Sequence, residues 1–102
     1  MNLNSQSVSH TRMISDFIQQ EAFTAENPVV APAIDEKFKL HPSHVRGCIN
    51  LVRSMGIPIC SNAKGYWYSS DPEEIQRTVD HIEDRIKKQQ EAVSGLRATL
   101  GQ

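Results

Sequence analysis

The fold of this chain is decided by the stretch Gly56-Ile57-Pro58-Ile59-Cys60-Ser61-Asn62-Ala63-Lys64-Gly65-Tyr66-Trp67-Tyr68. A short apolar run, a turn sequence at 62–65 and an aromatic run at 66–68 predict a β-hairpin. Pro58 lacks an amide donor and therefore belongs near the start of an edge strand. Gly65 supplies the positive φ expected at the end of the turn. Gly56 is the residue type favoured just after a helix, so a helix is expected to end directly before the hairpin.

That helix is expected to begin at Pro42, which suits the first helical position. Val45, Ile49 and Val52 recur at i, i+4 and i+7 and form its buried stripe. The opposite face is polar and cationic, and its side chains are of the types that bond phosphates and base edges. We therefore predict DNA contacts from this helix and from Lys64 in the hairpin turn. The candidates on the helix are Ser43, His44, Arg46, Gly47, Asn50 and Arg53.

Two further helices are expected upstream. The first begins at a cap, Ser7 or Ser9, and runs to about Glu21. The second covers residues 29–40, and Pro32 fits only in its first turn. The apolar face of the first helix is expected to consist of Met13, Ile14, Phe17 and Ile18.

A long helix is expected after the hairpin. Asp71 is a good N-cap, Pro72 suits the first position, and Glu74 completes a capping box. Apolar residues, with Gln89 as the one polar member, then recur at alternating steps of four and three positions, which is the heptad pattern of a coiled coil. This pattern predicts self-association, while the flanking positions Glu83 and Arg85 do not decide whether the helices are parallel. The predicted oligomerisation residues are Ile75, Val79, Ile82, Ile86, Gln89, Val93, Leu96 and Leu100.

The charge distribution supports a phosphate-binding surface in the middle of the chain. The formal net charge is only −1, but between Glu36 and Asp71 there is no carboxylate. A localised basic field on a small domain is typical of nucleic-acid binding. The basic residues of this window are Lys37, Lys39, Arg46, Arg53 and Lys64.

The 102 residues fit one domain, expected over 1–70, with an appended helix over 71–102. The N-terminus has no apolar run typical of a signal peptide, and no stretch has the length of a membrane span, so a cytoplasmic protein with reduced thiols is expected. Motifs of hydrolases, phosphate loops and zinc sites are missing from the sequence. We therefore expect no enzyme activity, no catalytic residues, no cofactor and no metal; His41, His44, Cys48 and Cys60 lack zinc-ligand spacing.

The order of helix, helix, tight turn, helix and hairpin resembles the winged helix-turn-helix domains of biotin-repressor and DeoR-like regulators. The resemblance is carried by residues 44–53, by Gly56-Ile57-Pro58-Ile59 and by Lys64-Gly65-Tyr66. The chain is also similar to small stand-alone winged-helix proteins of bacteriophages. The resemblance implies base or phosphate contacts from the third helix and a wing contact from Lys64. Those regulators usually carry a ligand-binding or catalytic domain, whereas this chain continues only into a heptad helix.

The sequence therefore predicts an α+β winged helix-turn-helix followed by a long C-terminal helix. The expected function is sequence-specific binding of double-stranded DNA as a homo-oligomer, as a phage or prophage transcription regulator in the bacterial cytoplasm. One alternative is an accessory protein of phage replication or recombination. Another is a protein-binding module that docks an acidic partner on its basic face.

Overall fold

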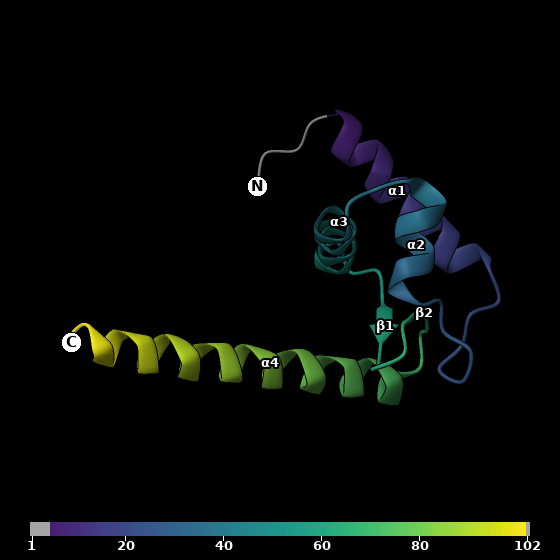
Figure 1. Ribbon diagram of the computed structural model, residues 1–102. Coiled ribbons are helices and arrows are strands. Elements are labelled where there is room, and N and C mark those ends of the chain that lie inside the picture. Colours follow the sequence, from purple (N-terminus) through teal and green to yellow (C-terminus); the bar gives the residue numbers. More distant parts are fainter. Residues whose placement is uncertain (1–4, 102) are drawn as a thin grey trace.

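The computed structural model describes residues 5–101 and has an α+β architecture (Figure 1). Three helices are followed by a two-stranded antiparallel hairpin and a long C-terminal helix. The helix order and the hairpin agree with the sequence-based prediction. The elements are α1 (Ser5–Gln20), α2 (Ala31–Phe38), α3 (Pro42–Ser54), β1 (Ile59–Ser61), β2 (Tyr66–Tyr68) and α4 (Pro72–Thr99).

The hydrophobic core lies where α1, α2, α3 and the hairpin meet. Three aromatic rings pack at its edge, with Phe17 edge-to-face against both Phe23 and Phe38. Burial of this apolar surface is the main force that holds the short elements together. The buried core residues are Ile14, Ile18, Val29, Ile34, Val45, Cys48, Ile49, Val52 and Ile59.

The first helix differs from its prediction at its start and on its buried face. It is already helical at Ser5, before both predicted caps. Met13 was expected in the core but is exposed, whereas Thr11 is buried and its hydroxyl donates to the Ser7 carbonyl at 2.7 Å. This hydrogen bond satisfies the buried hydroxyl, so a polar residue can occupy a position on the core-facing side. The buried face consists of Thr11, Ile14, Ser15 and Ile18.

Both ends of α3 have well-defined caps. At the start, Nδ1 of His41 accepts a hydrogen bond from the Ser43 amide at 3.1 Å, with Pro42 at the first helical position. At the end, Gly56 adopts a φ of +87°, a conformation that residues with a side chain rarely adopt. The predicted stop at Gly56 is therefore confirmed.

The hairpin is closed against the segment before α2. Ile59 pairs with Tyr68 and Ser61 with Tyr66, and an isolated bridge joins Tyr66 to Val29 through two hydrogen bonds. The positive φ predicted for Gly65 is wrong. Glycine is needed there for space, because a Cβ at position 65 would lie 2.1 Å from the Val29 carbonyl oxygen.

The base of α4 is docked on the hairpin. Trp67 is buried, Tyr68 is exposed, and the Trp67 indole donates to the Glu74 carboxylate. Of the three aromatics of β2, Trp67 therefore packs in the core. Asp71 caps α4 by accepting from the Glu73 amide, whereas the Asp71 amide donates to the Ser69 hydroxyl. The predicted capping box is therefore wrong, because Glu74 bonds the indole instead of the Asp71 amide.

Beyond its base, α4 projects away from the other elements (Figure 1). Every described residue from Glu83 to Gly101 is exposed. The helix ends at Thr99, and Leu100 is its C-cap. The structure thus divides α4, which the sequence predicted as one appended unit, into a packed base and a free distal half.

Candidate nucleic-acid interface

The outward face of α3 carries four of the predicted contact residues. Ser43, Arg46 and Asn50 are exposed, and Gly47 lies between them at helical spacing, opposite the buried stripe of the same helix. A Cβ at Gly47 would meet nothing within 4 Å, so this face is open beside the Arg46 and Asn50 side chains. A face with a guanidinium, a carboxamide and a hydroxyl can bond phosphate oxygens and base edges. Together, Ser43, Arg46, Gly47 and Asn50 are called the α3 face.

The start of α3 contains a residue that the sequence-based prediction missed. The His41 imidazole, besides capping the helix, lies 2.8 Å from the Ser43 hydroxyl through Nδ1. Histidine is not among the common N-cap residues, so sequence rules do not predict that His41 caps α3. The contact fixes the Ser43 side chain at the edge of the α3 face.

His44 does not belong to the outward face. Its Nε2 lies 2.9 Å from Nδ1 of His10 in α1, and the two rings pack edge-to-face. Cys48 Sγ lies 3.8 Å from the same Nε2. These contacts make His44 part of the α1–α3 packing. Among the described residues, no cluster of three or more His, Cys, Asp or Glu side chains suits a metal ion.

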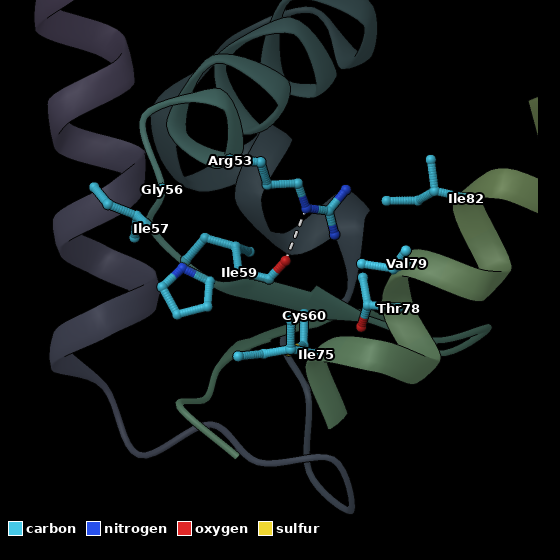
Figure 2. A pocket seen from close by; sticks show the side chains of 10 residues that line it. Arg53, Gly56, Ile57, Ile59, Cys60, Ile75, Thr78, Val79 and Ile82 are labelled. Carbon is cyan, nitrogen blue, oxygen red and sulfur yellow. Dashed lines mark hydrogen bonds between the residues drawn. The ribbon is translucent and has the colours of Figure 1, made fainter. Parts of the chain in front are cut away.

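Arg53 points toward the hairpin (Figure 2). Its Nε donates to the Ile59 carbonyl at 2.8 Å and its guanidinium donates to the Ser61 hydroxyl at 2.9 Å. The guanidinium also lies 5.7 Å from the ring centre of Tyr66. Burial lowers the pKa of Arg53 below its usual value. The structure therefore places this predicted DNA contact as a link between α3 and β1, apart from the α3 face.

The five cations of the acid-free window have different surroundings. Lys37 lies over the Phe17 ring, 4.9 Å from its centre, and Lys39 forms an ion pair with Glu36. Arg53 is bonded to the hairpin as described above. Within the described part of the chain, no partner is recorded for the side chains of Arg46 and Lys64. Arg46 and Lys64 are therefore the cations of the window that are both exposed and without a recorded contact to another side chain of the described residues.

Lys64 lies at the exposed tip of the hairpin. The Asn62 carboxamide oxygen accepts from the amides of Lys64 and Gly65, at 2.8 and 3.1 Å, and so holds the turn closed. Arg85 of α4 borders the same shallow hollow of 550 Å³ next to this tip and the start of α2. The sequence indicated Arg85 only as a flank of the heptad stripe, because nothing in the pattern brings it beside the hairpin. The hairpin tip thus has two cations, Lys64 and Arg85.

No family model, curated protein or solved structure matched this chain. Over the residues that the structure describes, no helix combines the length and apolarity needed to cross a membrane.

Proposed function

We propose that this protein is a winged helix-turn-helix protein that binds double-stranded DNA sequence-specifically as a homo-oligomer, and that it regulates transcription in a phage or prophage. In this proposal α3 is the recognition helix and the hairpin is the wing. The observation that carries it is the α3 face, a solvent-exposed and acid-free helix surface with an unpartnered Arg46 beside Asn50.

The arrangement of the elements supports the proposal. A recognition helix must project a face that its own domain does not use, and α3 buries one side while leaving the other open. Arginine pairs best with guanine and asparagine with adenine in the major groove. The hairpin tip supplies two further cations, Lys64 and Arg85, for contacts with phosphates.

Self-association is supported by the distal half of α4. Ile86 is 51% exposed, Leu96 68% and Leu100 72%, although all lie on one apolar stripe. A chain that projects such a stripe from a small core gains stability when another helix covers it. An oligomer also presents two recognition helices, so the target is expected to contain two symmetric half-sites.

The proposal is tested by selecting bound duplexes from a random DNA pool and measuring their affinity for variants. Arg46→Ala and Asn50→Ala are each expected to weaken specific binding by about 1–3 kcal/mol and to relax the preference at particular base pairs. Lys87→Ala, which removes an exposed charge from the distal half of α4, is the matched control and should leave base preference unchanged.

Three results would contradict the proposal. Equal affinity of the parent and both α3-face variants, with folding intact, would remove α3 as the reading element. Enrichment of no sequence from the pool would oppose sequence-specific regulation and favour a replication or recombination accessory role. Retention of an acidic protein at high salt, without DNA binding, would favour the protein-docking alternative.

A further inference from the structure

The apolar stripe of α4 faces two different environments. At the base, Ile75 and Ile82 are half-buried and point toward the hairpin side, and Thr78 is fully covered there. The Thr78 hydroxyl accepts from the Ser61 amide at 3.3 Å, which fixes this side of α4 against β1. Closer to the C-terminal end of α4, Ile86 and Val93 lie on the same side of the helix but are exposed.

An apolar groove marks the boundary between these two environments (Figure 2). It has a volume of 380 Å³ and lies between the end of α3, β1 and the base of α4. Ile57 and Ile59 form one wall, while Val79 and Ile82 form the other. The groove therefore opens onto the stripe just where α4 leaves the rest of the structure.

This arrangement discriminates between the two orientations of a helix pair. In a parallel, in-register pair, each Leu100 would meet its own copy, and the apolar groove beside Ile75 and Ile82 would stay open in both subunits. In an antiparallel pair, the end that approaches this corner is the C-terminal end of α4, which lies far from the other elements (Figure 1).

We infer that two copies of this chain pair antiparallel through the distal halves of α4, and that the C-terminal end of each α4 reaches the mouth of the other's groove. The inference rests on the self-association in the proposed function and adds its orientation and register. Leu100 then lies against the partner's Ile82, and Ile86 against the partner's Leu96. Gln89 lies against the partner's Val93.

The register follows from which residues are already covered. Packing between a and d positions is the usual pattern of antiparallel helix pairs. This register uses the exposed apolar residues Ile86, Val93, Leu96 and Leu100, and it leaves Ile75 to its own hairpin. The two-fold axis that relates the two helices then crosses them at the level of Glu91.

The occupant is a second copy because the stripe is self-complementary. Its a and d positions continue from the base to Leu100 with Gln89 as the one polar member, so an identical helix supplies matching knobs and holes. A short helix pair alone is marginal in water. Contact between Leu100 and the groove wall adds apolar burial at both ends of the pair.

Orientation is tested by cysteine cross-linking of full-length Ile86→Cys and Leu96→Cys, each alone and then mixed. In the antiparallel register, position 86 opposes position 96 of the partner, so disulfides form only in the mixture. Two copies of position 86, or of position 96, are about 15 Å apart along the axis, too far for a disulfide. The parent chain is the control, because Cys48 and Cys60 are buried.

The outcomes separate the inference from the proposed function. Disulfides in each single variant, with none between the two in the mixture, show a parallel pair and overturn the inference while leaving the oligomer intact. A dimer mass by sedimentation without any disulfide also overturns the proposed register. A monomer mass near 11.5 kDa at micromolar concentration overturns the oligomer itself, and the inference with it.

The groove contact is tested separately with Leu100→Asp. Leu100 is exposed in the single chain, so the variant is expected to fold normally. Its dimer dissociation constant should rise roughly tenfold or more, because a carboxylate replaces a leucine on an apolar wall. Ala98→Asp places the same charge on the outer side of the helix and should change the constant by less than about twofold. Equal weakening by both variants would contradict a specific contact at Leu100.

Discussion

The part of the chain from α1 to the base of α4 and the distal half of α4 contrast in how they use apolar residues. In the first region, isoleucines and valines from several elements are almost completely buried together. In the second, the same residue types repeat just as regularly, but they are exposed along a single helix. Regular apolar spacing therefore predicts which face of an element is apolar, and the tertiary structure decides whether that face is covered within the chain.

The largest effect on stability is expected from adding a single methyl group at Gly65, within the part of the chain from α1 to the base of α4. Gly65→Ala brings a Cβ to within 2.1 Å of the Val29 carbonyl oxygen, and this neighbour is backbone that cannot move aside cheaply. We expect a loss of several kcal/mol, which is a large part of the stability of a small domain. Gly47→Ala is the control, because its new methyl meets nothing, and alanine should gain about 1 kcal/mol in a helix.

Urea unfolding followed by circular dichroism measures both glycine variants. If Gly65→Ala were as stable as the parent, the close approach of the hairpin to the segment before α2 would not be a constraint on the fold.

The second largest effect is expected from removing the distal half of α4. A stop after Glu83 keeps Glu74 and Thr78, whose side chains bond the hairpin region, and the described residues that it removes, 84–101, are all exposed. The shortened chain should unfold at nearly the parent temperature but sediment as a monomer. Its DNA affinity should fall by roughly 10²–10⁴-fold, because linked sites raise the effective concentration of the second contact and because the tip cation Arg85 is also removed.

A stop after Ser70 sharpens the same comparison. It also removes Thr78 and Glu74, and it uncovers the buried Cys60 and Trp67. This shorter chain should lose thermal stability, whereas the stop after Glu83 should not. Equal melting temperatures for the two truncations would mean that the base of α4 adds nothing to the packed region.

A smaller effect is expected at the hairpin tip. Lys64→Ala and Arg85→Ala should each weaken binding to all DNA sequences by a similar factor, because phosphate contacts do not distinguish bases. Each should also lower the slope of log affinity against log salt by about one unit per lost contact. Titrations at several salt concentrations measure this slope. A slope identical to that of the parent in both variants would show that the tip does not contact DNA.

The smallest effect is expected on the pH dependence of the free energy of unfolding. Burial raises the pKa of the Cys60 thiol, partly opposed by its hydrogen bond with Thr78. The neutral thiol is favoured in the folded state, so its contribution to stability is complete below the ordinary thiol pKa of about 8.5 and is lost as pH rises through the folded-state pKa. Relative to Cys60→Ala, the parent should lose stability between neutral pH and pH 10, and by less than any of the variants above. A constant difference between the two chains would contradict the raised pKa.

The sequence predicted those features that depend on local rules. The buried stripe of α3, the stop at Gly56 and the start of α4 at Pro72 follow from helical periodicity and from the conformations of glycine and proline. The exposed positions Arg46 and Asn50 follow from the same periodicity. These predictions need no knowledge of the neighbouring elements.

The features that the sequence did not predict depend on contacts between distant segments. Glu74 was assigned to a cap and bonds Trp67, and Arg53 was assigned to DNA and bonds β1. Arg85 lies beside the hairpin tip only because α4 passes it. In each case a long side chain has several possible partners, and the packing of the elements selects one.

The two hydrogen bonds from Arg53 to the hairpin have a consequence for the thermodynamics of binding. They connect the last turn of α3 to both ends of β1, at Ile59 and Ser61. The hairpin is therefore held relative to the helix before any ligand arrives, and its conformational entropy is lost during folding. A binding surface that is ordered in advance loses less entropy on association, so a larger part of each new contact appears as affinity.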